Sequence, residues 1–171
     1  NDIHSHLNPT EVDRVERVSS LDHIQRAVRE AKAQGKGISL SGGRHAMGGQ
    51  QFGTGTLLLD MNQMNRVLRF DREKGQIEVE AGIQWPEIVD YLLETQRGQK
   101  KQWGIIQKQT GADRLSMGGA LSANVHGRGL RFKPFIADVE SFLLVEANGN
   151  VLHCSRRENA ELFRLAIGGY G

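Results

Sequence analysis

Glycine is concentrated in three short segments that are separated by apolar, patterned sequence. The first reads Ser41-Gly-Gly-Arg-His-Ala-Met-Gly-Gly-Gln50, the second spans residues 116–127, and the third comprises Gly168, Gly169 and Gly171. Glycine adopts positive φ readily and lets other groups approach the backbone closely, and successive N–H groups in such turns can converge on an anion. Simple turns explain any one of these segments, but three together favour a nucleotide-type ligand held by its phosphates.

Two common phosphate-binding motifs are absent from the chain. No Gly-Lys-Ser or Gly-Lys-Thr sequence occurs, so the P-loop pattern is missing. Residues 50–56 continue as a loop, whereas a long helix must follow the glycines of a Rossmann fingerprint. We therefore expect the ligand to be held in a different geometry.

Apolar spacing predicts a mixture of helices and strands along the chain. Helical periodicity begins at Ser20 and stops at Gly35, and it recurs over 85–95, 118–125 and 155–166. Strands are predicted near 12–18 and over 38–41, 57–61, 67–70, 77–81, 139–147 and 151–154. Because tight turns rather than helices join several of these strands, the pattern predicts an α+β fold and not a doubly wound parallel sheet.

Composition and charge exclude several classes of protein. The 171 residues are 38% hydrophobic and 25% charged, which is typical of a globular protein. The net charge is only +2 and the basic residues are scattered, so no nucleic-acid partner is predicted. No apolar run reaches the length of a membrane span. The oligomeric state stays open.

Metal and disulfide chemistry have little support in the sequence. The single cysteine, Cys154, excludes an internal disulfide and a multi-cysteine metal site, and it is interpreted as a small strand residue. His4-x-His6 could ligate a metal, but no carboxylate or cysteine is placed to complete the site. A solvated tail is therefore favoured over residues 1–8, and no metal is predicted.

The first residue is Asn1 rather than Met, and the chain stops within a glycine loop. We therefore expect it to be a piece of a longer protein, so that any targeting segment would lie outside the chain. The compartment stays open, with the cytoplasm favoured.

Motifs over nearly the whole chain resemble, in order, those of one flavoprotein family. They are Gly43-Arg-His45 followed by Met47-Gly-Gly-Gln50, the strand Leu58-Leu-Asp-Met61, residues 77–82, Ser116-Met-Gly-Gly-Ala-Leu-Ser-Ala-Asn-Val-His-Gly127, and residues 161–171. This order resembles the FAD-binding domain of the vanillyl-alcohol oxidase / p-cresol methylhydroxylase (PCMH-type) family of FAD-linked oxidoreductases.

The resemblance implies a two-lobed, PCMH-type α+β domain with FAD in the cleft between the lobes. The small N-terminal lobe would span about 1–81 and the second lobe about 82–171, and the substrate domain is absent from this chain. Implied cofactor-binding residues come from all three glycine segments: Ser41, Gly42, Gly43, Arg44, His45, Ala46, Met47, Gln50, Ser116, Gly118, Gly119, Ser122, Asn124, His126, Gly127 and Gly169.

His45 is the candidate for covalent attachment to the flavin 8α-methyl group, because several branches of the family carry such a link at the equivalent histidine. A neutral imidazole in an open glycine loop suits this chemistry. The alternative is a histidine that only forms hydrogen bonds within the loop.

The resemblance implies an FAD-dependent oxidase or dehydrogenase that acts on CH–OH donors by hydride transfer to flavin N5. The implied substrates are small molecules: a sugar alcohol, a sugar lactone, a prenylphosphoryl sugar or a hydroxy acid. Oxygen or another acceptor would reoxidise the flavin. No catalytic base is identified in this chain, which is expected to be inactive alone. The alternative is a flavin-free fragment or binding module that retains the fold without catalysis.

Overall fold

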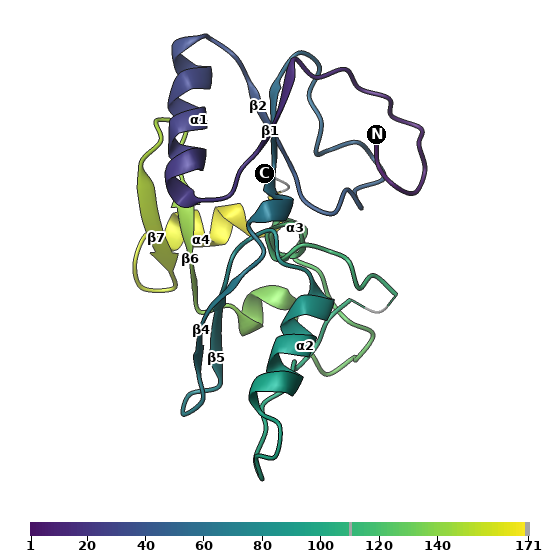
Figure 1. Ribbon diagram of the computed structural model, residues 1–171, viewed down its shortest axis with the longest axis vertical. Helices are drawn as coiled ribbons and strands as arrows, with labels where there is room; N and C mark the ends of the chain where they lie inside the picture. The colour runs from purple at the N-terminus through teal and green to yellow at the C-terminus, as the bar shows by residue number, and fades with distance from the viewer. Residues whose placement is uncertain (110, 170–171) are drawn as a thin grey trace.

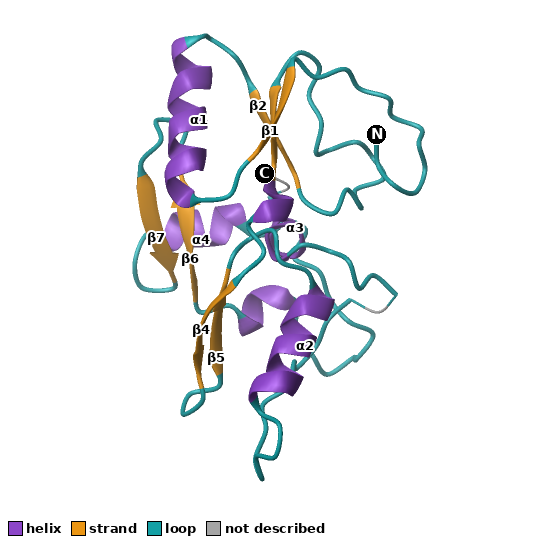
Figure 2. Ribbon diagram, viewed as in Figure 1, coloured by secondary structure: helices purple, strands orange, loops and turns teal. Residues whose placement is uncertain are grey.

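The computed structural model describes residues 1–109 and 111–169 and shows an α+β fold (Figures 1 and 2). Its strands form a three-stranded sheet in the order β1-β3-β2 and two separate hairpins, β4-β5 and β6-β7. The predicted fold class is therefore confirmed, and most predicted elements are present at or near their expected positions. No helix among the described residues is long and apolar enough to cross a membrane.

The three-stranded sheet is parallel, which the sequence pattern did not predict. β3 (Leu57–Asp60) lies between β1 (Arg14–Arg17) and β2 (Ile38–Ser41), and all four of its residues are buried. Helix α1 (Leu21–Ala33) joins β1 to β2, as a parallel connection requires. Strand β2 ends at Ser41, so the first glycine segment begins at this edge of the sheet.

Local signals set the ends of α1. The Ser20 side chain accepts a hydrogen bond from the His23 backbone at 3.2 Å and caps the first turn. After the last turn Gly35 has a φ of 64°, the left-handed conformation that glycine favours. The inner face of the helix packs Ala27 and Ala31 against the sheet.

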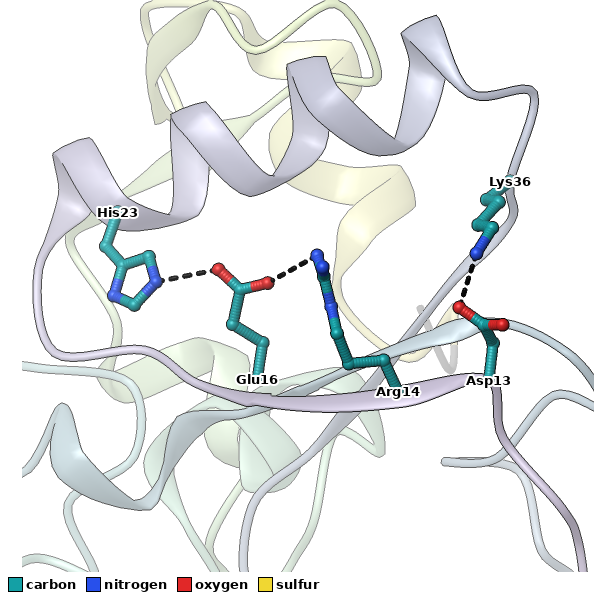
Figure 3. Close-up of polar contacts among 5 residues, drawn as sticks. All are labelled: Asp13, Arg14, Glu16, His23 and Lys36. Carbon is teal, nitrogen blue, oxygen red and sulfur yellow. Dashed lines mark hydrogen bonds and ion pairs between the residues drawn. The ribbon is translucent and has the colours of Figure 1, made fainter.

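Polar contacts also join β1 and the segment before it to α1 and the chain that follows (Figure 3). The Glu16 carboxylate accepts from Arg14 at 2.9 Å and contacts His23 on α1 at 2.8 Å, and Lys36 pairs with Asp13. Their side chains are 21–52% exposed, so these contacts add little to the packing free energy.

A second hydrophobic cluster surrounds α2 (Trp85–Thr95), whose bounds agree with the prediction. The hairpin of β4 (Val67–Asp71) and β5 (Gln76–Val79) contributes apolar residues to it, and Trp85 meets Phe135 edge-on at 5.7 Å between ring centroids. Pro86 occupies the first turn of α2, where its missing N–H has no helical partner to lose.

Glu80 is the buried anion that follows β5. Its carboxylate accepts from the Arg66 backbone at 2.8 Å and from the Arg66 guanidinium at 2.7 Å. These bonds, despite the opposing effect of burial, hold the pKa of Glu80 below its ordinary value of 4.5.

We expect Glu80→Gln to lower the free energy of unfolding by about 1–2 kcal/mol at pH 7, because charge-assisted hydrogen bonds are lost. A lowered folded-state pKa stabilises the protein above pH 4.5, and this stabilisation is lost as the pH falls through the folded value. Urea unfolding at pH 7 and at pH 4 measures the effect. The gap between wild type and variant should narrow at the lower pH, and a gap that widens would contradict the assignment.

The third cluster is built on the second hairpin. β6 (Ser141–Val145) pairs with β7 (Val151–Ser155), and α4 (Ala160–Ala166) packs on them, with Phe163 stacked on Phe142. Cys154 is fully buried in β7, which confirms its interpretation as a strand residue, and burial raises the pKa of its thiol.

The last helix is shorter than predicted. The pattern placed its start at Ser155, but the Ser155 hydroxyl accepts from the backbones of Arg157 and Glu158 and closes a turn there. Asn159 then takes a left-handed φ of 47°, and the helix begins only at Ala160. A side chain that competes for backbone N–H groups accounts for the difference.

Candidate functional site

The first glycine segment leaves β2 and lies against the start of the second. The Gly42 carbonyl accepts from the Asn62 side chain at 3.2 Å. A Cβ on Gly42 would overlap the Ser116 side chain, and a Cβ on Gly43 would overlap the Arg114 carbonyl. These contacts join two predicted site segments that are more than seventy positions apart in the sequence.

The second segment forms α3 (Met117–Ser122), near the middle of the molecule in Figure 2. Its start is set by Ser116, whose hydroxyl accepts from the Gly119 backbone at 3.3 Å. Close backbone approach then holds the helix, because Gly118 N donates to Ala81 O at 2.7 Å. The predicted helix over 118–125 is thus shorter and begins one residue earlier, since the chain turns at Asn124 with a φ of 44°.

Beyond α3, side-chain hydrogen bonds join the segment to residues before and after it in the sequence. Asn124 accepts from the Ile136 backbone at 3.1 Å, and Gly127 N donates to the Gln107 side chain at 3.4 Å. His126 is exposed, and its Nδ1 contacts the neighbouring Gly127 carbonyl.

The third glycine segment reaches the other end of α3. Gly168 N donates to the Leu121 carbonyl at 3.3 Å, and a Cβ on Gly168 would contact that of Asn124. Gly169 follows it, whereas Gly171 lies outside the described residues. Among the described residues, therefore, the three glycine segments meet around α3.

Four predicted site residues have no hydrogen bond that ties them to the place where the glycine segments meet, within the part of the chain that the structure describes. Met47 is 59% exposed and Gln50 is exposed, and the Met47 carbonyl accepts from Asn8 at 2.8 Å. The Ala46 carbonyl accepts from Gly49 N within the loop, and Ser122 is a half-buried residue of α3. Among the described residues, no hydrogen bond joins any of these four residues to the opposite glycine segment.

His45, in the first glycine segment, is partly buried and contacts a histidine near the N-terminus. Its Nδ1 lies 2.8 Å from Nε2 of His4, and its Nε2 is buried. Burial, and after it the neighbouring His4, lower the pKa of His45 from its ordinary 6.5, so the ring is neutral at pH 7.

The expected solvated tail over residues 1–8 is wrong. Asp2 is 1% exposed, and the arm that contains it runs beside the first glycine loop (Figure 1). The sequence signal for this contact was the His4-x-His6 pair, but the distant partner of His4 could not be identified from spacing. Folding of the arm on its own Asp2 carboxylate brings His4 to His45.

The residues present fit a large polar cofactor. Ser41 Oγ and Gln84 Oε1 are buried with no hydrogen-bond partner among the described residues, in segments that meet at Ser116, and buried polar atoms normally have partners. Arg44 has a left-handed backbone, which non-glycine residues other than Asn and Asp rarely adopt, and Asn124 adopts one as well. Orphaned polar atoms, strained backbone and close glycine contacts thus coincide at one place.

Comparison with solved structures identifies the fold. The chain superposes on a chitooligosaccharide oxidase with a TM-score of 0.79 and 21% identity, over 94% of this chain and 33% of the other. A xylooligosaccharide oxidase from Myceliophthora thermophila in complex with xylobiose gives a TM-score of 0.76 and 24% identity, with 94% and 33% coverage. The fold is thus that of the FAD-binding part of PCMH-type flavoproteins.

Residues 12–155 match the model of the FAD binding domain family. The chain belongs to this family, a member of the vanillyl-alcohol oxidase / PCMH flavoprotein group, and its cofactor is FAD. It is 32% identical over 149 residues to L-gulonolactone oxidase from Bos taurus, covering 86% of this chain and 32% of the relative. The chain therefore spans about a third of the length of the curated relatives it matches.

Proposed function

We propose that this chain is the FAD-binding part of an oxidoreductase that oxidises an alcohol-type carbon of a carbohydrate-like substrate. The observation that carries the proposal is the meeting of three glycine segments around α3 in a chain of the FAD binding domain family. When bound, the flavin would supply the redox chemistry by accepting a hydride at N5. Oxygen or another acceptor would then take the electrons.

Within this proposal the first loop and α3 form opposite walls for FAD. Gly42 and Gly43 keep the loop backbone close to Ser116 and Arg114. The remaining candidate residues line the walls on either side: Ser41, Arg44, His45, Ala46, Met47 and Gln50 on the first, and Gly118, Gly119, Ser122, Asn124, His126, Gly127 and Gly169 on the second. The division into lobes of about 1–81 and 82–171 belongs to the same proposal.

A sugar lactone is the favoured substrate among those that the resemblance implies. The relatives in support carry names such as L-gulonolactone oxidase and L-galactono-1,4-lactone dehydrogenase. Since the chain spans about a third of such relatives, we propose that the substrate pocket and its base lie outside residues 1–171.

His45 is the proposed site of covalent attachment to FAD. Its neutral ring meets the requirement for a nucleophilic nitrogen. We expect acid-precipitated wild-type protein to keep its yellow colour, whereas His45→Ala binds FAD but releases it on precipitation. Absorbance of pellet and supernatant measures the two fractions. His23→Ala, a histidine on α1 that contacts Glu16, is the matched control and should behave as wild type.

The full-length protein tests the wider proposal. The protein should be yellow. In the absence of oxygen, its substrate should reduce the flavin and bleach this colour. The compounds to test are a sugar lactone, a sugar alcohol, a prenylphosphoryl sugar and a hydroxy acid. A colourless protein that cannot be reconstituted with FAD would favour the flavin-free alternative.

A further inference from the structure

The turn between β6 and β7 is buried against α1. Gly149 forms this turn with a left-handed φ of 81° and is buried, although its neighbours Asn148 and Asn150 are exposed. Its carbonyl accepts from the Gln25 side chain at 2.7 Å and from the Arg29 guanidinium at 3.1 Å. Gln25 and Arg29 lie four positions apart on one face of α1, so both reach the same oxygen. We call these three residues, Gln25, Arg29 and Gly149, the α1–hairpin contact.

Close packing restricts this turn to glycine. A Cβ on Gly149 would lie 2.8 Å from Cγ and Nε of Arg29 and 3.1 Å from the Gln25 backbone carbonyl oxygen. The stem of Arg29 therefore lies against the turn while its guanidinium donates to the turn carbonyl. The contact joins residues 120 positions apart in the sequence, so it is a feature of the tertiary structure and not of the hairpin itself.

The α1–hairpin contact joins two parts of the chain that have separate apolar clusters. α1 packs on the three-stranded sheet through Ala27 and Ala31 in the first cluster, and the second hairpin packs on α4 in the third. Among the described residues, none belongs to both clusters. A common core therefore does not fix the orientation of one part relative to the other. Contacts between their surfaces must do so instead.

Each of these two parts is attached to one proposed wall of the FAD site. The sheet carries the first glycine segment, which begins where β2 ends at Ser41. The part that contains the second hairpin holds α3, because Leu121 packs in the third cluster and its carbonyl accepts from Gly168 N at 3.3 Å. Figure 1 shows α1 and the second hairpin on the opposite side of the sheet from the loop that follows β2. The α1–hairpin contact is therefore remote from the first wall, and we assign it no contact with FAD.

A second, distant attachment limits rotation that contacts at one place permit. The first loop and α3 already meet where Gly42 approaches Ser116. With attachment near α3 alone, the two parts could rotate about that place and change the spacing of the walls. The α1–hairpin contact lies far from this pivot and restrains the rotation.

We infer that Gln25 and Arg29 are positioning residues for FAD binding, which hold the two walls at the spacing that FAD bridges through their contact with Gly149. This rests on the proposed position of FAD between the first loop and α3. Without the contact, only a fraction of the apo-protein molecules holds that spacing. The apparent dissociation constant of FAD then rises in inverse proportion to this fraction.

The test removes the hydrogen bonds and keeps the size of the side chains. Gln25→Met and Arg29→Met replace the donors with unbranched residues that favour helix, and the double variant removes the whole polar contact. Arg26→Met is the matched control, because it removes the same charge from an exposed position of the same helix. All proteins are full-length and carry His45→Ala, so that FAD binding is reversible.

We expect the double variant to raise the dissociation constant of FAD about five- to tenfold, a common size for coupling between distant sites. Arg29→Lys, which keeps a donor, should lose less affinity than Arg29→Met. Arg26→Met should stay within about twofold of the parent protein, since salt screens a distant surface charge. Flavin fluorescence titrations measure the constants at a temperature at which circular dichroism shows every apo-protein to be folded. A role in stability alone would lower Tm and leave these constants unchanged.

Equal dissociation constants for the double variant and its parent would overturn the inference. An equal loss of affinity in Arg26→Met would overturn it too, because charge and not the contact would then account for the effect. If the double variant does not fold, the two single variants make the same comparison. A parent protein that takes up no FAD overturns the proposed function together with the inference.

Discussion

Replacement of Gly82 by alanine is expected to lower the free energy of unfolding by about 3 kcal/mol or more, which corresponds to a fall in Tm of about 6–12 °C for a chain of this size. The added Cβ would overlap the Met61 carbonyl oxygen and would lie 2.8 Å from the Met64 carbonyl oxygen. Both obstacles are backbone atoms, which a rotamer change cannot relieve. Gly82 N also donates to Met64 O at 2.8 Å, so the chain cannot simply move away.

The position of Gly82 increases this effect. Its neighbours on both sides hold α3, because Ala81 O accepts from Gly118 N and Ile83 O accepts from Met117 N. Displacement of residues 81–83 would therefore disturb the second wall of the site as well as the core around Ile83.

Gly104→Ala is the matched control for this experiment. Apart from Gly104 and its two chain neighbours, no atom of the described residues lies within 4 Å of the Cβ it would add, and the backbone there is not left-handed. Its stability should stay within about 0.5 kcal/mol of wild type. Thermal unfolding at equal FAD saturation makes the comparison, and equal Tm values for the two variants would show that the close contact at Gly82 is unimportant.

Gly42→Ala should weaken FAD binding at least tenfold, about 1.4 kcal/mol. The new Cβ would overlap the Ser116 hydroxyl and lie 2.8 Å from Ser116 Cβ. Ser116 is buried and its hydroxyl caps α3, so it has no free rotation that makes room. The first loop must then separate from α3, which widens the gap that FAD is proposed to bridge.

A double variant isolates this contact. Ser116→Gly removes the obstacle, so Gly42→Ala/Ser116→Gly should bind FAD more tightly than Gly42→Ala alone. Ser116→Gly alone completes the cycle and reports the loss of the cap. FAD titration monitored by flavin fluorescence measures all four proteins. If the two substitutions simply add, the loop and the helix do not act on FAD through their contact.

Local chemistry explains which features were predictable. α2 begins and ends as the pattern predicted because Pro86 and the apolar face Ile88–Leu92 are signals within one element. The hairpin turns at residues 71–75 and at Asn148-Gly149 were predictable for the same reason. The start of α4 was not predictable. The Ser155 hydroxyl forms a turn there that competes with the helix, and the outcome depends on small differences between local hydrogen bonds.

The sequence by itself determined the succession of helices and strands, the three glycine segments and the resemblance to an FAD-binding domain. These depend on residues close together in the chain, where spacing limits the geometry. Only the tertiary structure decided that β1, β3 and β2 pair in parallel, that the glycine segments meet around α3, and that His4 contacts His45 across 41 positions. Such contacts follow from the packing of the whole chain. Local spacing does not limit which distant polar group contacts His45, because that depends on the path of the folded backbone.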